Sequence, residues 1–376
     1  MISRLGDVAT YINGYPFKPE DWSDSGVQII RIQDLTGNSY QANRYNGIYD
    51  KKYEVNVGDV LISWSASLGV YIWQKGTAVL NQHIFKVVFD KVETDKKFFV
   101  YQVEAILEKA ASSAHGATMK HLTKPVFDAL PFYLPDINKQ KEIANRLCKV
   151  NNLISLRKKQ LQKLDDLVKA RFVEMFGDPV SNPKNWAVRP LLDMGDCKNG
   201  MNFHYDDSGV DLHCLGVGDF QNHSIITDTS TLSMVSLNEL PSDEYMLRDD
   251  DIVFVRSNGN KALVGRCVAV YPGDVPTTFS GFCIRYRKRD EEVTVPYLLR
   301  VLKADSMRRK MAGRGANIQN LNQQILGTLI IPVPPLALQE QFAVFVSQVD
   351  KSKLSIQQSL EKLETLKQSL MQQYFG

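Results

Sequence analysis

The stretch GATMKHLTKPVFDALPFYLPDINKQKEIANRL, residues 116–147, decides the architecture because the chain contains it twice. A shift of 199 positions (315 minus 116) aligns it without a gap with GANIQNLNQQILGTLIIPVPPLALQEQFAVFV, residues 315–346, and the match extends over 116–177 and 315–376. Identical residues recur along it, among them Gly116 and Gly315, Leu130 and Leu329, Gln140 and Gln339, and Leu164 and Leu363. Such a match indicates a tandem duplication, so the chain is expected to contain two structurally similar copies.

Upstream of this stretch the two copies are less alike but keep the same order. IIRIQDLTGN (29–38) resembles HCLGVGDFQN (213–222), and VGDVLISWSASLGVYIW (57–73) resembles RDDDIVFVRSNGNKALVGRCVAV (248–270). The globular halves have therefore diverged while the ends of the copies have not. This difference favours two halves that read different things on one shared structural frame.

Composition places the chain among soluble globular proteins. Its 376 residues are 44% apolar and 23% charged, with a net charge of +3. No stretch approaches the roughly 18 apolar residues needed to span a bilayer, and the start lacks a signal-peptide pattern, so a cytoplasmic location is expected. The five cysteines and six histidines show no metal-ligand spacing, so we expect neither disulfides nor a bound metal.

Each copy has the same internal plan, a mixed α/β (α+β) globular part followed by a long helix. Short β-branched and aromatic runs bounded by Gly, Asn and Asp predict strands at Val60–Trp64, Ile84–Phe89, Ile252–Val255, Val264–Tyr271 and Phe282–Tyr286. Each globular part ends in a Pro-punctuated extended segment that resists helix formation, and the long helix begins just beyond it. The expected domains are two globular parts at 1–137 and 178–336, and two helices at 138–177 and 337–376.

Both helices carry an apolar stripe with alternating steps of three and four residues, which is a heptad pattern. In the first copy the stripe reads Leu147, Val150, Ile154, Arg157, Leu161, Leu164, Val168, Arg171 and Met175. In the second it reads Val346, Val349, Lys353, Ile356, Leu360, Leu363, Lys367, Leu370 and Tyr374. We predict an intramolecular antiparallel coiled coil that joins the halves in a pseudo-twofold repeat. The alternative is that each helix packs on its own globular part.

Motifs for catalysis do not emerge from the sequence. It contains no P-loop and no Asn-Pro-Pro-Tyr/Phe string, so ATP hydrolysis and amino-methylation are not expected of this chain. Gly216-Val217-Gly218 lacks the third glycine of a dinucleotide site and is interpreted as a turn. The triplet at 249–251, Asp-Asp-Asp, is interpreted as a solvated turn. No catalytic, cofactor-binding or metal-binding residue is predicted.

Polar and basic side chains gather at matched places in the two halves. Arg suits the paired acceptors of guanine, and Asn or Gln suits adenine, so the mixture predicts a surface that reads bases. In the first half the candidates are Trp64, Ser65, Ser67, Thr118, Lys120, His121 and Lys124. In the second they are Arg256, Ser257, Asn258, Asn260, Lys261, Arg266, Arg314, Asn317, Gln319, Asn320 and Asn322. Between Arg285 and Arg314, ten Lys or Arg against four acids predict phosphate contacts.

The order of these motifs resembles one known family. LGDVATYINGYPFKPEDW, then IIRIQDL, GDVLISW, HGATMKHL with LPFYLPD, and the helix start KQKEIANRL, repeated through QEQFAVFV, are similar to the specificity subunits of type I restriction-modification systems. The resemblance covers essentially the whole chain. It implies two target-recognition domains that read the two parts of a split double-stranded DNA target. The recognition loops would be Ser63–Ser67 and His115–Lys124 in the first half, and Arg256–Lys261 and Arg314–Gln323 in the second.

The resemblance also implies partners and cofactors. The specificity subunit itself would be non-catalytic. Two methyltransferase subunits would bind S-adenosylmethionine and methylate adenine, and motor-nuclease subunits would use ATP and Mg²⁺. The helix pair would set the spacing of the half-sites and dock the methyltransferase subunits. Three alternatives stay open: a type IIB-like specificity subunit, a coiled-coil scaffold without DNA binding, and a free-standing nuclease.

Overall fold

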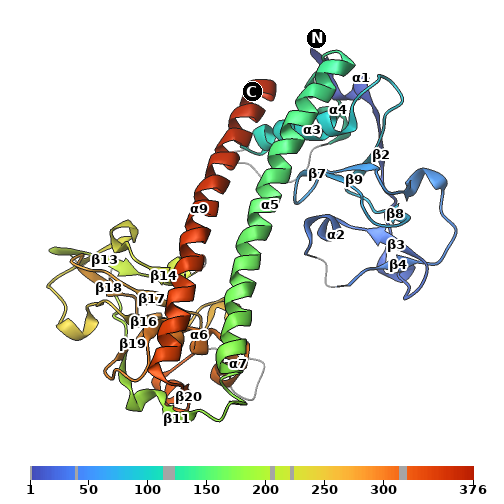
Figure 1. Cartoon of the computed structure of the whole chain (residues 1–376). Helices are drawn as coiled ribbons and strands as arrows, with labels where there is room; N and C mark the ends of the chain where they lie inside the picture. Colours follow the sequence, from blue (N-terminus) through green and yellow to red (C-terminus); the bar gives the residue numbers. More distant parts are fainter. Residues whose placement is uncertain (1, 39–40, 113–122, 204–207, 221–223, 313–319) are drawn as a thin grey trace. The chain divides into compact units, whose positions relative to one another are not determined.

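The structure of the chain is a computed structural model that describes all residues except 1, 39–40, 113–122, 204–207, 221–223 and 313–319 (Figure 1). The chain forms two compact units. The first unit is Met1–Lys159 with Gln357–Gly376, and the second is Gln160–Ile356. Each unit thus combines one globular part with the first half of one long helix and the last half of the other.

The first unit contains two four-stranded sheets and a short strand pair. One sheet has the order β2 (Thr10–Asn13), β9 (Ile84–Val88), β6 (Val60–Ser63) and β7 (Gly69–Ile72), with antiparallel neighbours. The other has the order β4 (Arg44–Tyr45), β3 (Val27–Ile30), β8 (Ala78–Leu80) and β5 (Glu54–Val55), in which β3 and β8 are parallel. The pair is β1 (Ile2–Arg4) against β10 (Pro131–Tyr133).

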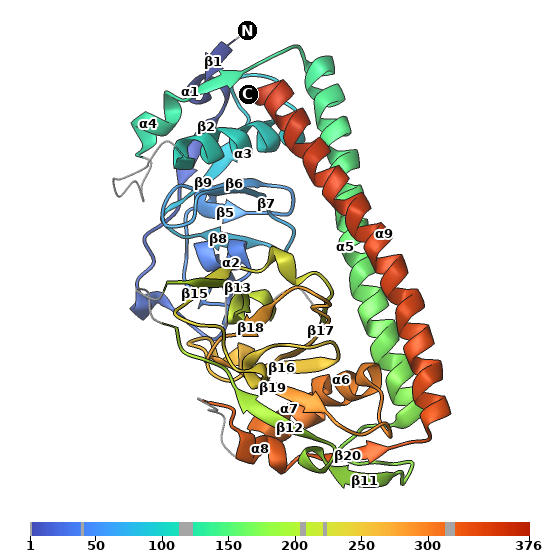
Figure 2. The ribbon, with the colours of Figure 1, turned by 90° about the vertical axis from the view of Figure 1, so that its left-hand side faces the viewer.

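Helix α3 (Lys96–Ser112) covers the first of these sheets (Figure 2). Its Phe98 and Phe99 are fully buried and pack against Phe132 of β10, so the helix, the sheet and the strand pair share one apolar core. The shorter helical segments are α1 (Leu5–Val8), α2 (Ile32–Thr36), α4 (Lys124–Asp128), η1 (Pro19–Asp21) and η2 (Lys51–Tyr53).

The second unit repeats most of this topology, with one strand more in its larger sheet and one fewer in its smaller sheet. Its larger sheet has the order β12 (Gly195–Asn199), β19 (Cys283–Lys288), β16 (Asp251–Val255), β17 (Cys267–Val270) and β14 (Ile225–Ile226). The smaller has the order β15 (Met234–Leu237), β13 (Val210–Leu215) and β18 (Thr277–Phe279), with β13 and β18 parallel as β3 and β8 are. The strand pair is β11 (Ala187–Pro190) against β20 (Ile330–Val333). The helical segments are α6 (Val295–Lys303), α7 (Asp305–Ala312), α8 (Gln323–Gly327), η3 (Leu191–Asp193), η4 (Val217–Phe220), η5 (Thr229–Thr231), η6 (Asp243–Tyr245) and η7 (Lys261–Leu263).

Two glycines show how closely the globular parts correspond. A Cβ on Gly14 would lie 2.0 Å from the carbonyl oxygen of Asn81, and one on Gly200 would lie 2.1 Å from that of Ser280. Asn81 and Ser280 are 199 positions apart, like the residues of the aligned stretch. The same close backbone approach therefore occurs in both units, which extends the duplication into the diverged regions.

The long helices α5 (Ile137–Phe176) and α9 (Leu336–Phe375) have 40 residues each, close to the expected bounds (Figure 1). Their contacts run in opposite directions. In the first unit Arg146 donates to the hydroxyl of Tyr374 at 3.2 Å, and Lys158 pairs with Glu364 at 2.9 Å. In the second unit Lys353 pairs with Asp165 at 2.7 Å. The helices are therefore antiparallel, as predicted.

A buried glutamine fixes the start of each long helix. Gln140 accepts a hydrogen bond from the backbone N–H of Asp95 at 2.9 Å and donates to the carbonyl of Pro135 at 2.9 Å. Its counterpart Gln339 accepts from the N–H of Thr294 at 2.8 Å and donates to the carbonyls of Glu292 and Pro334. Each such buried hydrogen bond stabilises the fold by about 1 kcal/mol. These bonds explain why both copies have glutamine at this position.

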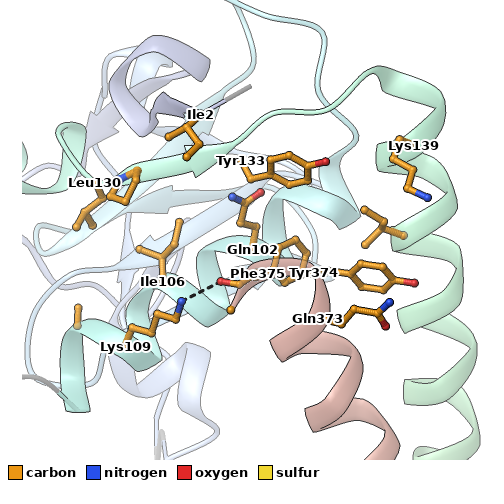
Figure 3. Close-up of a pocket in the computed structure, with 14 residues that line it drawn as sticks. Ile2, Gln102, Ile106, Lys109, Leu130, Tyr133, Lys139, Gln373, Tyr374 and Phe375 are labelled. Carbon is orange, nitrogen blue, oxygen red and sulfur yellow. Dashed lines mark hydrogen bonds between the residues drawn. The ribbon is translucent and has the colours of Figure 1, made fainter.

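Helix pairing is not the only way in which the apolar stripes are buried. Val168 and Met175 of α5 join the core of the second unit together with Phe172, Phe176 and residues of its sheet. Leu370 and Tyr374 of α9 pack against the core of the first unit. These ends pack on the globular part of the other copy. Only the starts of the stripes, Leu147 of α5 and Val346 and Val349 of α9, lie in the core of the helix's own globular part, so the alternative interpretation holds for the helix starts alone. The aromatic residues at the C-terminal ends of the two helices pack in the globular cores as well as along the helix pair, as Figure 3 shows for Tyr374 and Phe375 of α9.

Two expectations about charged residues were wrong. Asp251, expected in a solvated turn, is fully buried as the first residue of β16. Arg285, expected to meet phosphate, is 2% exposed and lies 3.2 Å from Asp196. Arg287 holds Asp251 through two bonds of 2.7 and 2.8 Å. Every residue of β16 is buried, and Arg285 and Arg287 lie on the adjacent strand β19, so these side chains are removed from water and opposite charges must pair.

Candidate nucleic-acid interface

In the second unit the backbone brings two candidate segments side by side. The first follows β16 and starts at Arg256, whose N–H donates to the carbonyl of Phe282 at 2.7 Å. The carbonyl of Arg256 accepts from the N–H of Leu321 at 2.8 Å, and Ser257 forms an isolated antiparallel bridge with Asn320. Segments that are more than 60 positions apart in the sequence therefore form one surface.

The asparagines of this surface shape its backbone through their side-chain oxygens. The Asn258 oxygen accepts from the N–H of Asn260 at 2.7 Å, and the Asn260 oxygen accepts from Ala262 at 3.1 Å. The Asn322 oxygen caps helix α8 by accepting from the N–H of Ile325 at 2.8 Å. Each bond engages the carboxamide oxygen, so the NH₂ group is the part of each side chain that can turn toward a base.

Arginines support this loop from two sides. Arg256 is half-buried, and one guanidinium nitrogen donates to the carbonyl of Gly281 at 3.3 Å. Arg308 of α7 donates to the carbonyls of Ala262 and Val264 at 3.1 and 3.2 Å. Arg266 is half-buried at the end of the loop, where its carbonyl accepts from the N–H of Val255. Arg308, expected among the phosphate contacts, thus holds the loop in place.

The matched loop of the first unit has the same backbone and different side chains. The N–H of Trp64 donates to the carbonyl of His83 at 3.2 Å, as that of Arg256 does to Phe282, and His83 and Phe282 are 199 positions apart. The Trp64 ring stacks on Phe85 with centroids 5.6 Å apart, and its N–H donates to the Asn13 side chain at 3.2 Å. Trp64 therefore has a packing role in addition to any role in recognition.

The other candidates of the first half differ in exposure. Ser65 is 4% exposed, whereas Ser67 is exposed and its N–H donates to the carbonyl of Ser65 at 2.7 Å. Lys124 is exposed on α4, pairs with Asp128 at 2.6 Å and lies over the Tyr11 ring at 5.8 Å. The first half thus presents Ser67 and Lys124 more openly than Trp64 and Ser65.

Six candidates lie outside the described residues: Thr118, Lys120, His121, Arg314, Asn317 and Gln319. The same holds for the side chain of Lys261. The predictions made for these seven side chains stay predictions.

Phe282 is a surface residue that the sequence interpretation missed. It is 60% exposed, and its carbonyl accepts from the N–H groups of both Arg256 and Ser257. The isolated Phe in SGFC had been assigned to a strand, where half of the side chains face inward. Its position just before β19 instead places an aromatic ring beside the polar loop.

The described residues contain no group of three His, Cys, Asp or Glu side chains that could hold a metal ion. Burial raises the pKa of the Cys197 and Cys214 thiols to about 12 and that of Cys267 to about 11, so these cysteines stay protonated at neutral pH. No helix in the described part of the chain is long and apolar enough to cross a membrane.

The comparisons with known proteins agree along the whole chain. Residues 1–166 and 183–367 match the family described as type I restriction modification DNA specificity domain. The MjaVIII type I restriction enzyme specificity subunit of Methanocaldococcus jannaschii is 22% identical over 405 residues, 98% of this chain and 90% of the relative. The StySPI specificity subunit of Salmonella potsdam is 23% identical, over 99% of this chain and 87% of the relative.

Solved structures show the same fold. The S subunit of the type I restriction-modification system from M. genitalium superposes with a TM-score of 0.55 at 16% identity, covering 99% of this chain and 94% of that one. These findings do not favour the type IIB-like, scaffold and nuclease alternatives. The chain therefore belongs to the type I restriction-modification DNA-specificity family, and it is a non-catalytic subunit that gives a larger complex its DNA sequence specificity.

Proposed function

We propose that each globular part, residues 1–137 and 178–336, is a target-recognition domain that reads one part of a split double-stranded DNA target. The observation that carries the proposal is the pairing of Ser257 with Asn320, which joins two polar segments into one surface beside Arg256. A guanidinium and several carboxamides on one surface can meet the base edges of both guanine and adenine. The diverged side chains of the two halves predict an asymmetric target.

Among the candidates, Arg256, Asn258, Asn260 and Asn320 are the contacts we propose for bases in the second half. Phe282 joins them, because an exposed ring can pack on a thymine methyl group or wedge between bases. Among the first-half candidates that the structure describes, Ser67 and Lys124 are exposed. Trp64 and Ser65 would act mainly by holding the loop that presents them.

The helix pair, residues 138–177 and 337–376, would set the spacing between the half-sites. A 40-residue helix is about 60 Å long at 1.5 Å per residue. The pair would also dock two methyltransferase subunits. Leu167 and Leu366 are equivalent positions of the repeat and are 47% and 45% exposed, so each unit carries one copy of the same apolar site. Two equal sites suit two identical partners.

The assembled complex would also hold motor-nuclease subunits. S-adenosylmethionine would bind to the methyltransferase subunits, and ATP with Mg²⁺ to the motor-nuclease subunits, in the cytoplasm. In that arrangement this chain contributes the choice of DNA sequence, and its partners contribute methylation and cleavage. It would bind none of these cofactors itself.

Methylome sequencing tests the assignment of the surface. In cells that contain the complex with Arg256→Ala, we expect relaxed specificity in one part of the split target, since a lost bidentate base contact costs roughly 1–3 kcal/mol. The other part should stay unchanged. Arg248→Ala is the matched control, because Arg248 is an exposed arginine of the same unit that pairs with Asp243. Relaxation of both parts, or of neither, would contradict the proposal.

A further inference from the structure

Two connecting segments meet at one end of the first unit's sheet of β2, β9, β6 and β7. Ser63, the last residue of β6, lies opposite both Gly69, where β7 begins, and Ile84, where β9 begins. The loop 64–68 and the turn 81–83 therefore lie at the same end of the sheet. The turn has the sequence Asn-Gln-His, and it lies outside the recognition loops expected from the sequence.

The second unit has a turn at the same place, with the sequence Ser-Gly-Phe at 280–282. Tyr15 forms an isolated parallel bridge with Asn81, and Met201 forms the same kind of bridge with Ser280. Asn81 and Ser280 are 199 positions apart, like the residues of the aligned stretch. The residues of the two turns can therefore be compared one by one.

In the second unit the polar side chain at this place comes from the loop. Arg256 is the first residue after β16, and its guanidinium donates to the carbonyl of Gly281 in the turn at 3.3 Å. Gly281 has no side chain that could reach a base, and the next residue, Phe282, is 60% exposed. This unit therefore combines a charged group from the loop with an aromatic ring from the turn.

In the first unit the polar side chain comes from the turn instead. The loop residue that corresponds to Arg256 is Trp64, whose ring stacks on Phe85 and whose indole N–H donates to the Asn13 side chain. Gln82 stands where the second unit has glycine, and its carboxamide has both a donor and an acceptor. The loop thus supplies a packing residue, and the turn supplies the hydrogen-bonding group.

The backbone of this turn is held in place, but the Gln82 side chain is not. The N–H of Gln82 donates to the carbonyl of Tyr15 and to the side-chain oxygen of Asn81, both at 2.9 Å. His83 has φ +72°, and its ring meets the Trp64 ring edge-on with centroids 5.0 Å apart. The Gln82 side chain is half-buried, and its carboxamide forms no hydrogen bond within the part of the chain that the structure describes. It can therefore bind a ligand without a loss of backbone freedom.

We propose that Gln82 is a specificity-determining residue of the first half, and that its carboxamide contacts an adenine of the target in the major groove. A carboxamide can donate to N7 of adenine and accept from its N6 amino group, a combination that guanine does not offer. The inference rests on the proposed function, in which each globular part reads one part of the target. It adds a residue of the first half that contacts a base.

Methylome sequencing of cells that contain the complex with Gln82→Ala tests the inference. At one adenine position of the target, the preference for adenine over other bases should fall by about tenfold or more, as loss of a bidentate base contact implies. That position should lie in the part of the target that Arg256→Ala leaves unchanged. An unaltered target overturns the proposal.

Gln74→Ala is the matched control. Gln74 is an exposed glutamine of the same unit, two residues beyond β7. The last residue of β7, Ile72, lies opposite Val60, the first residue of β6, so Gln74 lies beyond the other end of these strands. This variant should leave the whole target unchanged. Equal relaxation in Gln74→Ala and Gln82→Ala overturns the assignment of the contact to the turn.

A second variant separates base contact from a structural role of the side chain, and it also serves if Gln82→Ala fails to fold. Gln82→Glu keeps the size of the side chain but removes its donor, and a carboxylate accepts from the N4 amino group of cytosine. The preferred base at the same position should change from adenine to cytosine, by about tenfold or more. If the position keeps adenine or loses all preference, the assigned contact is wrong.

These outcomes also separate the inference from the proposed function. If Arg256→Ala relaxes one part of the target and neither variant of Gln82 alters the other, the role of Gln82 is overturned and the proposed function stands. If Gln82→Ala relaxes the same part as Arg256→Ala, the two globular parts do not read separately, and both proposals fail.

Discussion

The two units hold an acid–base pair at the same place in the fold, but they bury it to different depths. In the first unit Asp59 pairs with Lys86 at 3.2 Å, and their side chains are 25% and 17% exposed. In the second, Asp251 is fully buried with Arg287 and lies 3.9 Å from Arg285. Because the cost of removing a charge from water rises steeply with burial, the second pair depends far more on its partners.

The largest expected effect comes from breaking the buried cluster. Asp251→Asn removes the carboxylate that Arg287 binds and leaves Arg285 with Asp196 alone, and it should lower the free energy of unfolding by about 3–5 kcal/mol. Asp59→Asn, the matched change, should cost at most about 1 kcal/mol because Lys86 can reach water. Urea unfolding followed by circular dichroism gives both values. Similar losses in the two variants would show that burial does not distinguish the units.

The two buried glutamines at the starts of the long helices, Gln140 and Gln339, also differ between the units in the number of hydrogen bonds that they form. Gln339→Ala leaves the Thr294 N–H and the carbonyls of Glu292 and Pro334 without their partner, and should cost about 2–4 kcal/mol. Gln140→Ala breaks two bonds instead of three and should cost about 1 kcal/mol less. The same urea titrations compare the two. A larger loss of unfolding free energy in Gln140→Ala than in Gln339→Ala would contradict the explanation by the number of hydrogen bonds.

A reversed charge gives the next comparison. Glu104 of α3 pairs with Lys367 at 3.4 Å, but the counterpart residue is Lys303 of α6. Burial lowers the pKa of Lys303 to about 8, with Arg300 and Lys353 acting in the same direction. Below pH 8 the lysine is charged in both the folded and the unfolded state, so the full cost of burying the charge is present at neutral pH.

Lys303→Met should therefore raise the free energy of unfolding at pH 7, by roughly 1–2 kcal/mol. In the unchanged protein, stability should rise from pH 8 toward pH 10.5, because in that window the unfolded state binds more protons than the folded state. The variant should lose this part of the rise. Parallel pH profiles for the two proteins would show that Lys303 keeps its ordinary pKa.

The two long helices and several strands could be predicted from the sequence, because the helices are repeated and their apolar residues recur with a regular period. The expected helices at 138–177 and 337–376 differ by one residue at each end from α5 and α9. The strand expected at Ile84–Phe89 is β9, Ile84–Val88. Periodicity identifies elements whose exposed and buried sides alternate regularly, and duplication confirms each element a second time.

The surface was less predictable because its residues act through distant partners. The stacking of Trp64 on Phe85 was not apparent from the sequence, and Phe282, predicted to start a strand, lies before β19 and is 60% exposed. Arg285 belonged to a basic run, and only the pairing of β16 with β19 turns it toward the buried Asp251. Such contacts join residues tens of positions apart, which local composition does not encode.

The smallest expected effect concerns the turn before the two equivalent strands. Gly58 has φ +88° and its counterpart Asp250 has φ +68°, so both copies keep a left-handed residue there. Gly58→Ala should cost about 1 kcal/mol through backbone strain alone, since nothing lies within 4 Å of the added Cβ. Asp250→Gly should change stability by less than about 0.5 kcal/mol, because relief of strain is offset by the entropy of the unfolded chain. If thermal unfolding instead shows equal losses, the turn depends on the side chains and not on the backbone conformation that the copies share.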